Sequence, residues 1–278
     1  MRRANLADRL VLAYVAGVGV LILLLRHRVP GWPAFLALHV VSIALVGALV
    51  QNAGRWSTAH AWYPLALPLI LFEEVAALNF LLVDGWRDHY LLAFEARLFA
   101  ETPTVWLGRF ASPLVTEMLS VGYFSYFLIL IIVAGVFDRR ADKAPFFGVM
   151  AASLLSYLVC YAVFIAFPTE GPSHTLRHLH IVSLTGGPFH EMVAYIQSSA
   201  GVHGNAFPSA HAAGAVAALV FAWRYAPKLA AWLTLPVVLM SIGAVYLRYH
   251  YASDIVAGVL IGAGSAAVVL WTQSWRRS

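Results

Sequence analysis

Residues 207–254 read FPSAHAAGAVAALVFAWRYAPKLAAWLTLPVVLMSIGAVYLRYHYASD. Two apolar runs in this stretch are separated by the turn-forming residues 226–228. An apolar helix of about 18 residues is about 27 Å long, which is close to the thickness of a bilayer core. The chain should therefore cross a membrane along the first run and return along the second. This places His211 and His250, at the two ends of the stretch, at the same membrane face.

The same apolar pattern recurs along the whole chain. The 278 residues are 61% hydrophobic and only 11% charged, whereas a soluble domain carries about 25% charged residues. A soluble protein is disfavoured, because too few polar residues remain to cover its surface. We expect an all-α, polytopic membrane helix bundle. Its expected spans are residues 10–25, 33–50, 61–82, 113–137, 146–167, 209–225, 229–247 and 251–272.

Two long segments between these spans are too polar to cross. Residues 84–112 mix aromatic residues with charges of both signs and have apolar residues at near-helical spacing, which predicts a helix lying in the interface. Residues 168–208 are rich in Pro, Gly, Ser and His, and irregular loops of this length are usually functional. We therefore divide the chain into two N-terminal transmembrane helices, residues 1–60, and a six-helix catalytic core, residues 61–278.

The distribution of positive charge predicts the orientation of the spans. Eleven of the 18 Lys and Arg residues fall on one side: Arg2, Arg3, Arg9, Arg55, Arg139, Arg140, Lys143, Arg224, Lys228, Arg276 and Arg277. The positive-inside rule makes this side, with both termini, cytoplasmic. The polar segments then lie on the extracytoplasmic face, and we expect the membrane to be the plasma membrane. The basic residues form no patch or tail, which argues against a nucleic-acid partner.

Four residues of the opening stretch are of the types that a phosphoryl-transfer site uses. His250 and Asp254 are four apart and share a helix face, so the carboxylate can fix the tautomer and leave one ring nitrogen free. His211 follows a Pro at an expected helix start, where free backbone N–H groups favour an anion. The charged fork of Arg248 matches phosphate oxygens. One His could attack phosphorus and the other protonate the leaving oxygen, with no metal needed.

These residues resemble a known family. Phe207 to His211, and Arg248 with His250 and Asp254, are similar to the second and third signature motifs of the type 2 phosphatidic acid phosphatase superfamily, which includes the vanadium haloperoxidases. The resemblance covers roughly residues 61–272 and implies a phosphatidic acid phosphatase-like six-helix core. It implies that His250 forms a phosphohistidine, that Asp254 supports it and that His211 protonates the leaving group.

The same resemblance implies that Ser209 and the backbone amides around Ala210 hold the phosphate. The sequence departs from the family pattern in having Ala210 in place of Gly, Arg248 rather than an Arg at position 244, and no first motif. The segment 167–172 stands in its place and resembles the inositol phosphorylceramide synthase branch. A second basic phosphate contact must come from elsewhere. Our candidates are Arg177 first, then His174 and Arg87.

Several further polar residues need an assignment. Glu73 and Glu74 fall within the third span, where carboxylates usually face a cavity or a partner. They either bind a polyol headgroup or a proton, or pair with a basic residue of a neighbouring helix. His39 we expect to form structural hydrogen bonds. Four histidines lie in the polar segment 168–208: His174, His178, His180 and His190. No Cys or carboxylate stands at zinc-ligand spacing from them, so we expect no metal and no cofactor.

The sequence thus predicts a membrane-integral, metal-independent phosphatase or phosphotransferase. Its partner would be a lipid phosphate or phospholipid, and the final acceptor either water or a headgroup alcohol such as inositol. An intramembrane serine protease with Ser209 as nucleophile is an alternative. A transporter with Glu73 and Glu74 in a proton path is another. Whether the protein is a homo-oligomer stays open.

Overall fold

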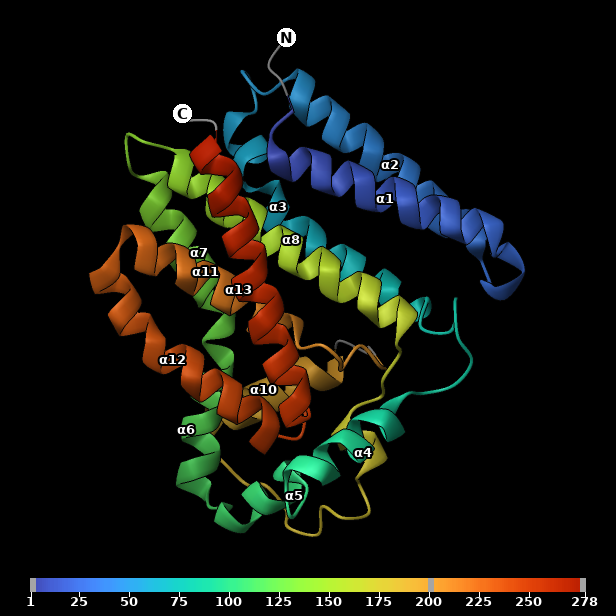
Figure 1. Ribbon diagram of the computed structural model, residues 1–278, viewed down its shortest axis with the longest axis vertical. Helices are drawn as coiled ribbons and strands as arrows, with labels where there is room; N and C mark the ends of the chain where they lie inside the picture. The colour runs from blue at the N-terminus through green and yellow to red at the C-terminus, as the bar shows by residue number, and fades with distance from the viewer. Residues whose placement is uncertain (1–3, 200–202, 276–278) are drawn as a thin grey trace.

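The computed structural model describes residues 4–199 and 203–275, and these residues form helices and loops without strands. Helices occupy all the predicted spans, and the fourth span is divided in two (Figure 1). The all-α prediction is confirmed. The helices are α1 (Leu6–Leu24), α2 (Trp32–Gln51), α3 (Ser57–Ala77), α6 (Pro113–Phe124), α7 (Tyr126–Asp138), α8 (Ala144–Ala166), α11 (Ala210–Tyr225), α12 (Pro227–Tyr246) and α13 (Ala252–Trp275).

Within the described chain, six helical segments are long and apolar enough to cross a membrane, two fewer than predicted. The two that fall short are α3 and α11. Helix α11 has only 16 residues, whereas a full crossing takes about 20. Helix α3 carries Pro64, Pro68 and two glutamates within its length. Because α11 packs against α7, α8, α12 and α13, protein rather than lipid surrounds it. The six long apolar helices make this an integral membrane protein.

The N-terminal helices join the rest of the bundle through α3 and α8. Helix α1 packs on α2 and α8, and α2 contacts α3, as the upper right of Figure 1 shows. One buried residue ties three helices together: His39 Nδ1 lies 2.7 Å from the Val15 carbonyl oxygen, and its Nε2 lies 2.7 Å from Glu74 Oε1. His39 thus has the structural role expected of it. We propose residues 1–60 as an accessory pair beside the catalytic core.

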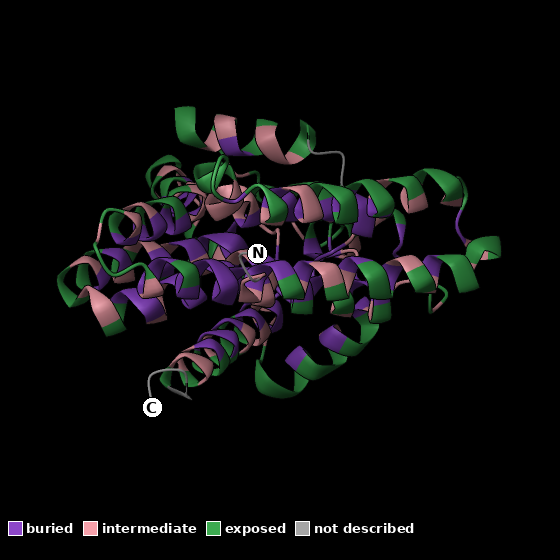
Figure 2. Cartoon of the chain, turned by 90° about the horizontal axis from the view of Figure 1, so that it is seen from above, coloured by how far each residue is buried: buried purple, intermediate pink, exposed green. Residues whose placement is uncertain are grey.

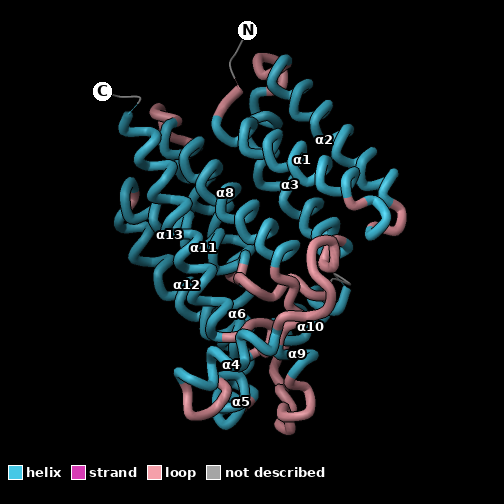
Figure 3. Tube along the Cα trace, turned by 45° about the vertical axis from the view of Figure 1, so that its right-hand side comes forward, coloured by secondary structure: helices cyan, strands magenta, loops and turns pink. Residues whose placement is uncertain are grey.

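Most of the irregular structure lies at one end of the bundle. The start of α1 and the end of α13 lie together at the opposite end (Figure 1), while Arg2, Arg3, Arg276 and Arg277 lie outside the described residues. Figure 3 shows the long loops gathered around the short helices. The polar segment 84–112 contains α4 (Asp88–Leu98) and α5 (Pro103–Leu107), and the segment 168–208 contains α9 (Pro172–Thr175) and α10 (Pro188–Ser199).

Helices α11 and α13 pack closely against each other. A Cβ atom on Gly258 would lie 2.4 Å from the Ser209 carbonyl oxygen, and one on Gly262 would lie 2.3 Å from the Ala213 carbonyl oxygen. Small residues four apart allow two helix backbones to approach this closely. Buried residues accordingly concentrate on the inward sides of the helices (Figure 2). This packing sets the start of α13, with Asp254, against the start of α11.

Candidate active site

His211 and His250 meet at the loop-rich end of the bundle. His211 lies in the first turn of α11, and His250 lies in the loop between α12 and α13. His250 Nε2 is 3.4 Å from His211 Nδ1, and the ring centroids are 5.6 Å apart. The helical hairpin of α11 and α12 therefore brings together two residues that are 39 positions apart in sequence.

The hydrogen bonds of His250 fix its tautomer. Its Nδ1 lies 2.9 Å from the Ala206 carbonyl oxygen and 3.3 Å from Asp254 Oδ2. Because a carbonyl oxygen only accepts, Nδ1 carries the proton, and the lone pair of Nε2 faces His211. Asp254 Oδ2 also accepts from the Tyr251 backbone N–H at 2.8 Å. Burial lowers the pKa of His250 to about 4, so the ring is neutral at neutral pH.

The first turn of α11 is held by its own cap and by aromatic rings. Ser209 Oγ accepts a hydrogen bond from the Ala212 backbone N–H at 3.3 Å, and its side chain is fully buried. The ring of Tyr126 stands edge-on to His211 with centroids 4.3 Å apart. The hydroxyl of Ser209 therefore caps the N-terminus of α11. Ala210 begins α11 and is buried.

Two carboxylates of α4 hold the loop that carries His250, and sequence reasoning missed both. Asp88 Oδ1 accepts from the Gly171 backbone N–H at 2.8 Å and from the Tyr251 hydroxyl at 3.0 Å. Glu95 Oε1 accepts from the backbone N–H and the hydroxyl of Ser253, at 2.8 and 3.0 Å. Both carboxylates are buried. Helix α4 thus supports the residues that follow the histidine, Tyr251 and Ser253.

A polar cavity of about 330 Å³ opens beside the two histidines. Several different helices and loops contribute to its wall. The lining residues are Leu69, Phe72, Glu73, Tyr123, Tyr126, Phe127, Glu170, Ser173, His174, Ile196, Gln197, Gly204, Asn205, Ala206, His211, Tyr249 and His250. Among these described residues, none is Lys or Arg, and two are glutamates. Ser209 and Ala210 are not part of the lining.

The two glutamates of α3 have different places. Glu73 is exposed and lines the polar cavity. Glu74 is buried and pairs with His39 of α2. Each of the two interpretations left open by the sequence thus fits the position of one glutamate: Glu73 faces the cavity, and Glu74 joins two helices.

The arginines expected to contact phosphate lie elsewhere. Arg248, whose backbone φ is +69°, donates from Nη2 to the Val182 carbonyl oxygen and lines a separate cavity with His180. Arg177 is exposed and Arg87 half-buried, and neither lines the polar cavity. The structure therefore brings none of these three guanidinium groups to the histidine pair.

Helix α10 covers one side of the cavity, and the sequence did not predict it. Its residues Ile196 and Gln197 line the cavity, and Gln197 Nε2 donates to the Tyr123 hydroxyl at 2.6 Å. The start of α10 is held by Glu117, whose carboxylate accepts three backbone N–H groups at 2.7–3.1 Å, those of Gly187, Phe189 and His190. A carboxylate at a helix N-terminus satisfies donors that have no intrahelical partner.

A membrane bundle with two facing imidazoles, one oriented by a carbonyl and a carboxylate, defines a phosphatase-like membrane protein. Sequence comparison agrees: residues 89–268, more than half of the chain, match the PAP2 superfamily, and the chain belongs to that superfamily. The matched region contains α4 except its first residue, Asp88, together with both histidines and Asp254. Membership implies a phosphate-ester substrate. No curated protein and no solved structure matches the chain.

Proposed function

We propose that this protein transfers a phosphoryl group from a lipid-linked phosphate or phosphodiester through a phosphohistidine on His250. The observation that carries the proposal is the unprotonated Nε2 of His250, which lies 3.4 Å from Nδ1 of a second imidazole. In the first step Nε2 bonds to phosphorus, the bond from phosphorus to the leaving oxygen breaks, and His211, protonated when the anionic substrate is bound, gives that oxygen its proton. In the second step an acceptor hydroxyl attacks phosphorus, the N–P bond breaks, and His211 takes the acceptor's proton.

Substrate binding must separate the two rings. A phosphate oxygen lies about 2.8 Å from each hydrogen-bonding nitrogen, so an oxygen placed between the histidines requires a wider gap than 3.4 Å. His250 is fixed by Ala206 and Asp254. The ring of His211 has an edge-on contact with Tyr126. Among the described residues, its one hydrogen bond is the contact with His250. We therefore expect His211 to be the ring that moves.

An apolar cavity beside the site supports a lipid substrate. It has a volume of about 360 Å³ and lies between α3, α7 and α8. It shares five wall residues with the polar cavity: Leu69, Phe72, Tyr126, Phe127 and His211. An amphiphile fits such a pair of cavities, with its phosphate beside the histidines and the start of its apolar tail between the helices.

A headgroup alcohol as acceptor, as in the inositol phosphorylceramide synthase-like branch, is the second candidate. One observation favours it: the carboxylates of Glu73 and Glu170 both line the polar cavity. Ionised carboxylates accept hydrogen bonds from hydroxyl groups, and a polyol offers several. The resemblance of residues 167–172 to that branch points the same way.

The orientation of the site follows from the charge distribution and remains part of the proposal. The loop between α7 and α8 carries Arg139, Arg140 and Lys143. The positive-inside rule assigns this loop and both termini to the cytoplasm. The histidine pair, at the other end of the bundle, would then act at the extracytoplasmic leaflet of the plasma membrane.

The test uses the purified full-length chain in nanodiscs. Wild-type protein should release phosphate from phosphatidate or a polyprenyl diphosphate, or exchange the headgroup of phosphatidylinositol with free inositol. Substrate labelled with ³²P on the reacting phosphate should leave a base-stable, acid-labile label on the protein. His250→Ala should remove both turnover and label, while His178→Ala, at an exposed loop position, should change neither. Turnover that persists in His250→Ala would sink the proposal.

The same preparation separates the alternatives. An intramembrane protease would lose activity in Ser209→Ala and keep it in His211→Ala, although the capping role of Ser209 argues against a nucleophile. A transporter would move substrate into proteoliposomes even with His250→Ala. Our proposal expects neither result.

A further inference from the structure

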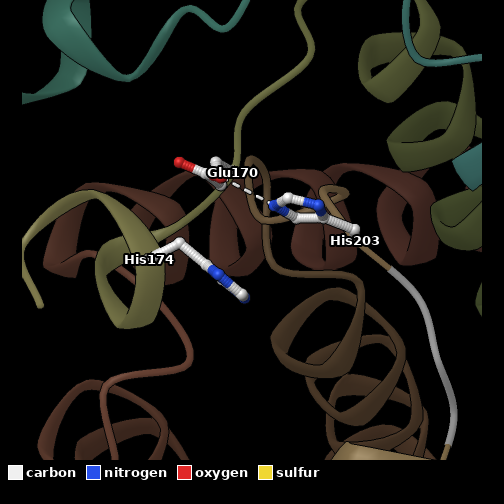
Figure 4. Close-up of side chains that lie close together, drawn as sticks. All are labelled: Glu170, His174 and His203. Atoms are coloured by element: carbon white, nitrogen blue, oxygen red, sulfur yellow. Dashed lines mark hydrogen bonds and ion pairs between the residues drawn. The ribbon is translucent and has the colours of Figure 1, made fainter.

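Two arginines of the loop-rich end line a cavity of their own. At the rim of the cavity that contains the histidine pair, the charged residue is a carboxylate: Glu170 Oε1 lies 2.7 Å from His203 Nε2, with His174 beside them (Figure 4). Arg109 and Arg248 instead line a cavity of about 250 Å³, which we call the basic cavity. Its described lining residues are all different from those of the two cavities beside the histidines. The basic cavity is therefore a separate place on the molecule.

The charge of Arg248 is not balanced by the protein. Its Nη2 donates to the Val182 carbonyl oxygen. Within the described part of the chain, the buried Nε of Arg248 has no hydrogen-bond partner, and no acidic side chain pairs with the guanidinium group. A charged donor that is shielded from water and left without a partner costs free energy. An anion in the basic cavity would remove that cost.

The other charged groups of the basic cavity leave it positive. Arg109 Nη2 lies 2.7 Å from Glu101 Oε2, so this carboxylate balances one of the two arginines. The side chain of Arg109 is 65% exposed, and an exposed ion pair contributes little to stability, so Arg109 can turn toward another anion. Burial and the charge of Arg248 lower the pKa of His180 to about 4. His180 is therefore neutral at neutral pH, and one positive charge remains.

A wide apolar groove meets the basic cavity at Glu101 and Arg109, which line both. The groove has a volume of about 1100 Å³ and lies between α5 and the helices α12 and α13. Phe99, Trp106 and Ile242 line it and are exposed. Exposed aromatic and aliphatic side chains beside charged residues are typical of the level where lipid headgroups meet acyl chains. The groove and the basic cavity thus have the two chemical characters of a phospholipid.

We propose that the basic cavity and the apolar groove together bind one anionic phospholipid, with its phosphate between Arg109 and Arg248 and its acyl chains between α5, α12 and α13. The planar fork of an arginine matches phosphate oxygens, and basic pockets between membrane helices bind anionic headgroups. A zwitterionic lipid would fit the groove but would bring no net negative charge to balance Arg248. The inference does not rest on the proposed function, because the site is apart from the histidine pair.

The proposed lipid site adjoins the segment that carries His250. Arg248, two residues before the histidine, lines the basic cavity, and Ala252, two residues after it, lines the apolar groove. A bound lipid would therefore contact the chain on both sides of His250 and restrict the motion of this segment. Because a ligand that binds the native state stabilises it, we expect the lipid to raise the thermal stability of the protein.

The first experiment counts bound lipids. Full-length protein is reconstituted in nanodiscs of phosphatidylcholine with phosphatidylglycerol, and native mass spectrometry measures which lipids it retains. Wild type should retain one phosphatidylglycerol with at least about a tenfold preference over phosphatidylcholine. Arg248→Gln and Arg109→Gln should each lower this preference about tenfold. Arg97→Gln, at an exposed position of α4 that lines neither cavity, should keep it.

A variant of the groove tests the acyl chains without changing any charge. Ala100 is exposed and lines the groove, so Ala100→Phe should lower the retention of phosphatidylglycerol. Equal retention of the two lipids by wild type would overturn the site. So would a preference that survives in both Arg248→Gln and Arg109→Gln, or one that Arg97→Gln removes as well.

The second experiment distinguishes this site from the histidine pair and a lipid from a free anion. Phosphatidylglycerol at ten times its Kd, added in neutral detergent, should raise the melting temperature of wild type and of His250→Ala alike, by about 3–5 °C. Arg248→Gln should lose this shift. A shift that His250→Ala abolishes would place the lipid at the histidines, and an equal shift with inorganic phosphate would replace the lipid by a free anion; either result rejects the proposal. Turnover that persists in His250→Ala would reject the phosphohistidine and leave this lipid site standing.

Discussion

His250 is buried, with 4% of its surface exposed, and this burial controls its charge. Burial lowers its pKa to about 4, against an ordinary value of about 6.5. The unfolded chain therefore binds a proton more readily than the native one, and His250 should cost stability as pH falls from about 6.5 to 4. In the native protein the ring is neutral above about pH 4, and in the proposed mechanism this form attacks phosphorus through Nε2.

Titration of the His250 ring tests this directly. With ¹⁵N-labelled histidine in the substrate-free protein, we expect the His250 ring signals to change with a midpoint near pH 4 rather than near 6.5. The spectrum of His250→Ala assigns the signals. A midpoint near 6.5 would mean that the ring is solvated, and half of it would then be protonated and unreactive in mildly acidic conditions.

Asp254 and the Ala206 carbonyl both contact Nδ1 of His250 and orient its ring. The carbonyl lies closer to Nδ1 than the carboxylate does, at 2.9 against 3.3 Å. Asp254→Asn should therefore keep the tautomer and lose only the stabilisation of charge on the ring. We expect kcat for phosphate release to fall about 10- to 100-fold with little change in KM, against complete loss in His250→Ala. An equally complete loss in Asp254→Asn would show that the carboxylate alone fixes the tautomer.

At the scale of residues, the sequence predicted those site residues that lie close together along the chain or at the two ends of one helical hairpin. His250 and Asp254 are one helical turn apart, and the lengths of two apolar runs brought His211 to them. Asp88 and Glu95 were missed, since their partners lie 82–163 positions away and a lone acidic residue on an amphipathic segment carries no periodic signal. Arg248 was expected to contact phosphate because it adjoins His250, but a left-handed backbone turns it toward Val182.

At the scale of elements, the contact between α11 and α13 determines whether the site assembles. A Cβ atom on Gly258 would lie 2.4 Å from a backbone oxygen, whereas one on Gly264, in the same helix, would meet nothing within 4 Å. Gly258→Ala must push the helices apart and should destabilise the protein by about 1–3 kcal/mol. Gly264→Ala should be neutral or slightly stabilising, because Ala favours helix.

Thermal unfolding of both variants in detergent checks this prediction. Gly258→Ala should unfold at a lower temperature than wild type and should also lose phosphate release, since Ser209 N donates to the Asp254 carbonyl oxygen across this contact. Equal melting temperatures for the two variants would show that the helices adjust without cost.

The positions of the long helices were predictable because apolar length is a strong local signal. The helices at the loop-rich end of the bundle were less predictable from the sequence. Helix α10 depends on Glu117, which lies on α6 some 70 residues earlier and accepts its first backbone N–H groups. Helices α3 and α11 occupy predicted spans but fall short of a lipid-facing helix for different reasons. Helix α11 is short and covered by its neighbours, whereas α3 carries two prolines and two glutamates.

At the scale of the whole molecule, two adjoining cavities relate the membrane to the chemistry. The polar cavity contains both histidines, and the apolar one reaches between α3 and α7. The glutamates and both histidines line the first cavity, whereas mostly apolar side chains line the second. Their shared wall at Tyr126 and His211 lets a substrate occupy both.

Narrowing the apolar cavity should therefore affect only substrates with a tail. Ala66 is exposed on α3 and lines this cavity. Ala66→Phe displaces about two methylene groups of a bound chain, each contributing about 0.8 kcal/mol, so KM for a long-chain substrate should rise about tenfold. KM for a short, water-soluble phosphate ester should stay the same.

Val40→Phe, on the exposed face of α2, is the control and should change neither value. An equal rise for both substrates in Ala66→Phe would mean that the substitution distorts the histidine pair, and no rise for either would place the lipid tail outside this cavity.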